Sequence, residues 1–241
     1  RRPACYTPRP CKSCIFANVM SVNVDITAAE QDPVAWAKAY PFDVPERSYI
    51  YAASGSHVLA RGAPGAWHAA EVQGDGTRRP LAEALGEDGF AALLQARHAV
   101  IACGSNAAPG RLAQKYGALG ADSVVPTLRV TVRDHVVVYA ANFTAYGSVP
   151  ATMAHVPGAA TEVFVNLLTE RQIDIMDATE GGYDRVTLRA GIAELETGER
   201  LGEVETYVSH HGGLRHDSGL IALAAVRHAG ASLAAMTQVE A

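Results

Sequence analysis

The feature that most constrains the fold is a series of short β-rich runs in the second part of the chain. From His98 onward, runs rich in β-branched residues are separated by turn-forming segments. Runs of this length and composition are typical of strands. The six predicted strands span His98 to Cys103, Val124 to Val132, His135 to Ala141, Glu162 to Leu168, Asp184 to Ala190 and Glu203 to Val208. Together they predict a sheet or a small barrel.

Helical spacing is less frequent in this part of the chain. It predicts helices over Pro109 to Tyr116, Thr169 to Glu180 and Leu220 to Met236. Strands and helices therefore do not alternate, as a doubly wound parallel sheet would require. The predicted fold class is α+β, with a mixed small β-barrel or sheet and flanking helices.

The part of the chain before residue 96 carries no functional motif. Its pattern predicts a helix over Thr27 to Tyr40, a strand over Ser48 to Ala53, loops over 54–80 and a second helix over Pro80 to Gln95. We interpret 20–95 as an N-terminal α/β extension of unknown role, which precedes a domain at 96–241. Residues 1–19 are interpreted as a non-native or disordered segment, because Met20 offers a natural start.

Composition excludes several classes of partner. The formal charge of -5 lacks the basic excess that binding to nucleic acid requires. No run approaches the roughly 18 apolar residues of a membrane span, so a soluble protein without a membrane partner is expected. Cys5, Cys11 and Cys14 cluster at the start and Cys103 stands alone, which is no disulfide framework and favours a reducing, cytoplasmic location. The Cys11–Cys14 pair lacks a second pair of metal ligands.

The first candidate site is the tripeptide Gly104-Ser105-Asn106. It follows a buried apolar strand, and Pro109 then opens a helix. Glycine allows the backbone to approach a ligand closely, and free amides at a turn and a helix start can hold a carboxylate. Taken alone, the tripeptide is also a common turn.

The second candidate is Glu180, at the end of a helix whose start is marked by the capping-box pair Thr169 and Gln172. Ile173, Met176 and Glu180 follow helical spacing, so the carboxylate lies on the apolar stripe. Burial and the negative end of the helix dipole both disfavour its charged form, which suits a general base. The alternative is a frayed last turn that lets Glu180 reach water.

These two segments together resemble a known family. Gly104-Ser105-Asn106 after a strand, and Glu180-Gly181-x-Tyr183-x-Arg185 after a helix, are similar to the two signature segments of γ-glutamylcyclotransferase-like proteins. Their order and wide separation agree with the family, and so do the segment 150–153 and the run at 162–168. The resemblance covers about 98–210 and implies the family's fold for this region.

The resemblance also implies a reaction. The backbone around Gly104, Ser105 and Asn106 would bind the substrate's carboxylate or carbonyl. Glu180 would accept a proton from the α-ammonium group, and the freed amine would attack the γ-carbonyl, form 5-oxoproline and expel an amine or amino acid. No metal or organic cofactor is required. Tyr183 would shape or polarise the pocket, and Arg185 would pair with a carboxylate or be structural.

Two departures from the family concern the pocket. Cys103 stands where the family commonly has tyrosine, and Ala107 where leucine often follows the asparagine. Loss of an aromatic wall would open space for a different acyl group. Cys103 is interpreted either as a nucleophile activated by His98 or another histidine, or as a small hydrophobic residue that ends a buried strand.

Other readings of the same residues remain open. The pocket would also suit an amide hydrolase, with water or Cys103 as the nucleophile, or a non-catalytic module that binds a small molecule. His210, His211, His216 and Asp217 form a dense polar group, but their spacing is no recognised metal signature, so no metal site is predicted. The expected partner is a small molecule with a carboxylate or an amide. A homo-oligomer formed through 220–236 stays open.

Overall fold

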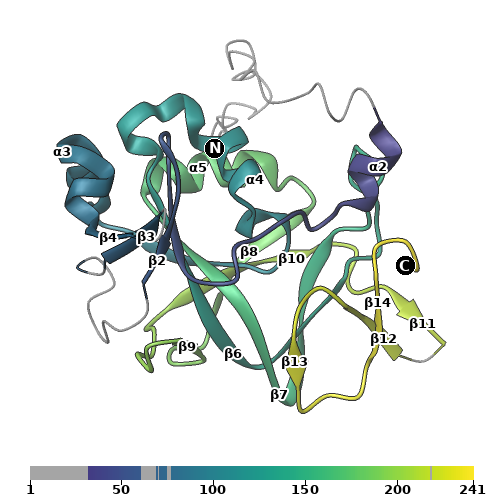
Figure 1. The fold of residues 1–241 in the computed structure, drawn as a ribbon. Helices are drawn as coiled ribbons and strands as arrows, with labels where there is room; N and C mark the ends of the chain where they lie inside the picture. The colour runs from purple at the N-terminus through teal and green to yellow at the C-terminus, as the bar shows by residue number, and fades with distance from the viewer. Residues whose placement is uncertain (1–31, 61–68, 70, 75–76, 218) are drawn as a thin grey trace, which may run out of the picture.

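A computed structural model describes residues 32–60, 69, 71–74, 77–217 and 219–241 of the chain. The Cys11–Cys14 pair, the segment 1–19 and the first residues of the helix predicted from Thr27 lie outside these residues. Helices α3, α4 and α5 gather in the upper half of Figure 1, and the long strands β6 and β7 run through its lower half. None of the helices in the described ranges is both long enough and apolar enough to cross a membrane.

The elements alternate irregularly along the chain, with strands in the majority. The helices are α2 (Pro33–Lys38), α3 (Leu81–Leu93), α4 (Pro109–Tyr116) and α5 (Glu170–Thr179), with 3₁₀ segments η4 (Ser105–Ala107) and η5 (Gly117–Ser123). The strands are β1 (Tyr49–Ala52), β2 (Gly55–Leu59), β3 (Glu71–Gly74), β4 (Thr77–Pro80), β5 (His98–Ala102), β6 (Val125–Tyr139), β7 (Ala151–Leu168), β8 (Tyr183–Leu188), β9 (Ala193–Leu195), β10 (Val204–Ser209), β11 (Arg215–His216), β12 (Gly219–Leu223), β13 (His228–Ala229) and β14 (Ala234–Met236).

One mixed sheet organises the molecule. Its main path runs β4-β3-β2-β1-β6-β7-β5-β10-β8. Neighbours along this path are antiparallel except β5 and β10, which are parallel. In the described part of the chain the path stays open, so the structure has a sheet and not a closed barrel. The predicted α+β class, with a mixed sheet and few helices, is confirmed.

The strands predicted over 124–132 and 135–141 form one strand, β6, instead of two. Its pairing with β7 shifts register between Arg133 and His135, where Asp134 adopts a left-handed backbone with φ of 57°. Opposite this single residue, β7 has four residues, 156–159, and the Gly158 amide donates to Asp134 Oδ1 at 2.9 Å. The irregularity of the pairing therefore lies mainly in β7, and β6 continues through the polar residues that suggested a break.

The helix predicted over Leu220 to Met236 is wrong, because this segment forms β12, β13 and β14. Strand β12 pairs with both β6 and β14, and its Ile221, Ala222 and Leu223 are all buried. A strand that is covered on both faces has an unbroken apolar sequence, and an Ala- and Leu-rich helix has the same appearance. Tertiary pairing, which local composition does not record, decides between them.

The N-terminal strands continue the same sheet. Strand β1 pairs with β6, and β2, β3 and β4 follow in order. Ile50, Val72 and Leu81 share a hydrophobic cluster with Ile101 and Val130. The division into 20–95 and 96–241 stays a prediction, while this cluster joins residues from both parts.

Candidate active site

The loop at Gly104, Ser105 and Asn106 leaves the end of β5 and is held in place through its carbonyl groups. Asn166 Nδ2 donates to the Asn106 carbonyl at 2.9 Å, and the Tyr49 hydroxyl donates to the Ala107 carbonyl at 2.6 Å. The amides of residues 104–106 have no acceptor among the described residues. The loop therefore presents N–H groups without a described acceptor on a backbone that is fixed through the carbonyls of Asn106 and Ala107.

Glu180 caps the C-terminal end of α5. The capping box predicted at the start of this helix is present, with Thr169 and Gln172 each bonded to the other's backbone. The Glu180 side chain is 17% exposed, which makes it a partly buried carboxylate at a helix end. The start of α5 thus follows from a local signal in the sequence.

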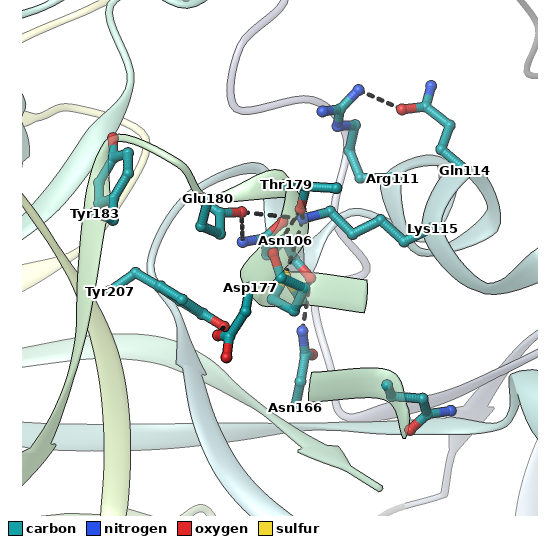
Figure 2. A network of polar contacts seen from close by, with 12 residues as sticks. Asn106, Arg111, Gln114, Lys115, Asn166, Asp177, Thr179, Glu180, Tyr183 and Tyr207 are labelled. Atoms are coloured by element: carbon teal, nitrogen blue, oxygen red, sulfur yellow. Dashed lines mark hydrogen bonds and ion pairs between the residues drawn. The ribbon is translucent and has the colours of Figure 1, made fainter. Parts of the chain in front are cut away.

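Two donors hold the same oxygen of Glu180. Asn106 Nδ2 lies 2.9 Å and Lys115 Nζ 3.0 Å from Oε1. Figure 2 shows both groups converging on the carboxylate, with Lys115 reaching it from α4. The second oxygen, Oε2, accepts no hydrogen bond from any residue that the structure describes. The carboxylate is therefore oriented through one oxygen and free at the other.

Sequence reasoning missed Lys115. Its side chain is 6% exposed, and Nζ also contacts Thr179 Oγ1 at 2.5 Å and Met176 Sδ at 2.9 Å. Burial lowers the pKa of Lys115, and the neighbouring Glu180 opposes that shift. The sequence shows only a lysine in the last turn of α4, and this does not indicate that its side chain contacts the end of α5.

A pocket of about 410 Å³ lies between the loop and the end of α5. This volume is within the range of roughly 300–1,000 Å³ that small-molecule sites occupy. Six of the predicted site residues line it, namely Cys103, Gly104, Ser105, Asn106, Glu180 and Tyr183. Tyr183 donates its hydroxyl to the Ala151 carbonyl at 3.1 Å, so its ring is fixed as part of the wall.

Arg185 is not brought to this pocket. Its guanidinium contacts Asp177 Oδ1 at 3.1 Å and Glu205 Oε1 at 2.5 Å. Asp177 also accepts the Tyr207 hydroxyl at 2.5 Å. Arg185 thus belongs to a partly exposed ion-pair network, in agreement with the structural reading of this residue.

The environment of Cys103 does not favour a nucleophile. Burial, with a smaller contribution from Glu180, raises the pKa of the Cys103 thiol to about 12. A thiolate is the reactive form of cysteine, and it is scarce well below the pKa. His98 lies at the opposite end of β5, where Nε2 contacts Glu170 at 2.7 Å. The surroundings of Cys103 therefore match a small residue that ends a strand.

An arginine that the sequence did not single out forms part of the pocket wall. The Arg111 guanidinium lies 5.8 Å from the Phe42 ring centroid and 5.6 Å from that of Tyr146. Its Nη1 donates to Gln114, and its buried Nε has no partner among the described residues. Cation–π contacts of this kind stabilise a desolvated guanidinium. Lys115 and Arg111 both line the pocket, and Lys115 is the one recorded in contact with Glu180.

The side chains of His210, His216 and Asp217 do not converge as the ligands of one metal ion would. His210 Nε2 contacts Asp184 at 3.0 Å, and His216 Nε2 lies 3.8 Å from Asp217. No cluster of three or more His, Cys, Asp or Glu side chains suited to a metal ion occurs in the described ranges. The structure therefore gives no second candidate centre here.

Among known proteins, similarity is found to several solved structures. No family model and no curated protein matches the chain. A solved γ-glutamyl cyclotransferase has 14% identity and a TM-score of 0.40 over 48% of this chain and 68% of its own. A protein from Arabidopsis thaliana has 18% identity and a TM-score of 0.39 over 48% and 71%. An uncharacterized protein from Homo sapiens has 14% identity and a TM-score of 0.40, over 48% of this chain and 68% of its own. Over about half of its length, the chain is similar in fold to γ-glutamylcyclotransferase-like structures.

Proposed function

We propose that this chain is a cyclotransferase that cleaves a γ-glutamyl or related amide, forms 5-oxoproline and releases an amine or amino acid. The observation that carries the proposal is the arrangement of Glu180. Its Oε1 is fixed by Asn106 and Lys115, Oε2 has no hydrogen-bond donor among the described residues, and Glu180 lines the pocket. A carboxylate oriented in this way is suited to accept and return a proton.

The reaction follows from this arrangement. Glu180 Oε2 takes a proton from the α-ammonium group of the substrate, and the neutral nitrogen attacks the γ-carbonyl carbon. The tetrahedral intermediate then collapses, the original C–N bond breaks, and Glu180 returns the proton to the leaving nitrogen. The attacking nitrogen loses its second proton to the released amine, so the products are a neutral lactam and an ammonium ion. The attacking nitrogen and the γ-carbonyl belong to the same substrate molecule, so the attack is intramolecular.

The loop provides the second part of the proposed machinery. The free amides of Gly104, Ser105 and Asn106 are donors for a carboxylate or carbonyl oxygen of the substrate. Their orientation is supported by the hydrogen bonds from Asn166 and Tyr49 to the loop carbonyls. Asn106 also links the loop to Glu180, so that the two groups are held at a fixed separation.

The test is release of 5-oxoproline from a panel of γ-glutamyl amines and γ-glutamyl amino acids. Glu180→Gln keeps the shape of the side chain and removes its basicity, so we expect kcat to fall by about 100-fold or more. Glu170→Gln is a matched control, because Glu170 belongs to the same helix and its side chain is 81% exposed. We expect this control to keep wild-type kcat.

The products decide between the proposal and its alternatives. Free glutamate in place of 5-oxoproline would indicate attack by water and refute cyclisation. Absence of turnover across the panel, with binding retained, would favour a non-catalytic module. Melting curves of both variants separate loss of catalysis from loss of folding.

A further inference from the structure

A tyrosine from the N-terminal part of the chain reaches the loop of the candidate active site. Tyr40 follows α2 directly and is 6% exposed. The amide of Ala151 donates to its hydroxyl oxygen at 2.7 Å. A Cβ atom on Gly104 would lie 2.1 Å from the same oxygen, so the absence of a side chain at Gly104 is what admits the hydroxyl.

The hydroxyl proton of Tyr40 is available to a ligand. Tyr40 lines the pocket, and no residue in the described ranges accepts a hydrogen bond from its hydroxyl. Tyr183, also on the pocket wall, differs because it donates to the Ala151 carbonyl. The Ala151 amide thus donates to the Tyr40 hydroxyl oxygen, whereas the Ala151 carbonyl accepts the hydroxyl proton of Tyr183. Of these two tyrosines, Tyr40 is the one that retains a free donor.

The environment keeps this donor neutral. Burial raises the pKa of Tyr40 well above its ordinary value, and the nearby Cys103 and Tyr183 act in the same direction. A neutral hydroxyl on a buried side chain is suited to stabilise an oxygen on which negative charge develops. The free amides of the neighbouring loop are donors of the same kind.

We propose that Tyr40 Oη donates a hydrogen bond to the γ-carbonyl oxygen of the substrate and stabilises the oxyanion of the tetrahedral intermediate. The inference rests on the proposed cyclotransferase reaction and gives the N-terminal part of the chain a catalytic residue. Glu180 moves the protons, and Tyr40 with the amides of the Gly104 loop holds the oxygen.

The attachment of α2 supports a fixed position for this hydroxyl. Ser148 Oγ donates to the Ala37 carbonyl at 2.8 Å, close to the end of the helix. The Tyr40 ring also contacts Phe42 edge-on, with centroids 6.2 Å apart. Hydrogen bonds at Ala37 and Tyr40 therefore fasten the segment to residues 148–151, so the donor is held before the substrate arrives.

Tyr40→Phe tests the inference, with Tyr139→Phe as the matched control. Tyr139 is buried and donates to the Met236 carbonyl at 3.1 Å, and it is not among the pocket residues. Loss of one oxyanion donor typically lowers kcat by about 100-fold or more. We expect that loss in Tyr40→Phe with KM nearly unchanged, and wild-type kcat in Tyr139→Phe.

The outcomes separate this inference from the proposed function. Wild-type protein that releases no 5-oxoproline would refute both. Active wild-type protein with full kcat in a folded Tyr40→Phe variant would refute the role of Tyr40 alone.

A fluorinated tyrosine at position 40 covers the case in which Tyr40→Phe fails to fold. This residue keeps the hydroxyl and the bond from Ala151 but is more acidic. We expect the alkaline limb of the kcat profile to move to lower pH. An unchanged profile would overturn the inference.

Discussion

At the scale of single residues, the pocket depends on two ionisable side chains that contact each other inside it. Lys115 is 6% and Glu180 17% exposed, and their charged atoms are 3.0 Å apart. Removing one member of a buried ion pair leaves the other uncompensated, whereas replacing both is often tolerated. Lys115 therefore positions Glu180, and each residue also limits the electrostatic cost of burying the other.

This pairing predicts non-additive effects on stability. Lys115→Met should lower the free energy of unfolding by about 3 kcal/mol, because Glu180 is left without its cation. The double variant Lys115→Met with Glu180→Gln should recover much of that loss, while 5-oxoproline release stays abolished. Urea unfolding of the wild type, both single variants and the double variant measures the coupling. Additive losses would show that the ion pair is not coupled.

At the scale of elements, the C-terminal segment shows how pairing overrides composition. Gly230 follows β13 with φ of 74°, a left-handed backbone that favours glycine. A Cβ atom at this position would lie 2.2 Å from the Gly158 carbonyl oxygen in β7. The close approach of these two backbones allows β13 to pair with β7, which no helix over the same residues would permit.

Gly230→Ala should therefore destabilise the protein by about 2 kcal/mol or more, through both the backbone conformation and the contact with Gly158. Gly202→Ala is the matched control, because a Cβ atom there would contact nothing within 4 Å. Thermal unfolding of the two variants checks the prediction. Equal melting temperatures would contradict the strand arrangement of this segment.

At the scale of the whole molecule, folding buries several tyrosines in the interior. Tyr49 and Tyr116 are fully buried, and burial raises the pKa of each. Burial also raises the pKa of Tyr139 to about 12. The unfolded chain releases these protons near pH 10.0, where the folded protein still retains them. The folded state is therefore disfavoured as pH rises above that value.

We expect the contribution of these tyrosines to the free energy of unfolding to be constant below pH 10 and to fall above it. The fall is at most about 1.4 kcal/mol per pH unit for each of Tyr49 and Tyr116. Burial lowers the pKa of Lys115, which acts in the opposite direction at alkaline pH but concerns a single group. Urea unfolding at increasing pH, with tyrosinate absorbance as a second probe, measures the slope. Tyr116→Phe should reduce it, and an unchanged slope would contradict the assignment.

Local signals determined the parts of this protein that depend on neighbours in sequence. The capping box of Thr169 and Gln172, Pro109 at the start of α4, and the apolar run that becomes β5 are each visible without a structure. These features could be predicted because their interactions lie within one or two turns or along one strand.

Tertiary structure decided what depends on distant residues. It brought Lys115 to Glu180 and Tyr40 to Gly104, and it directed Arg185 to Asp177 and Glu205. It also made strands of 219–236, where composition favoured a helix. The physical reason is the same in each case. Hydrophobic periodicity records which face of an element is buried, but it does not record which element covers that face.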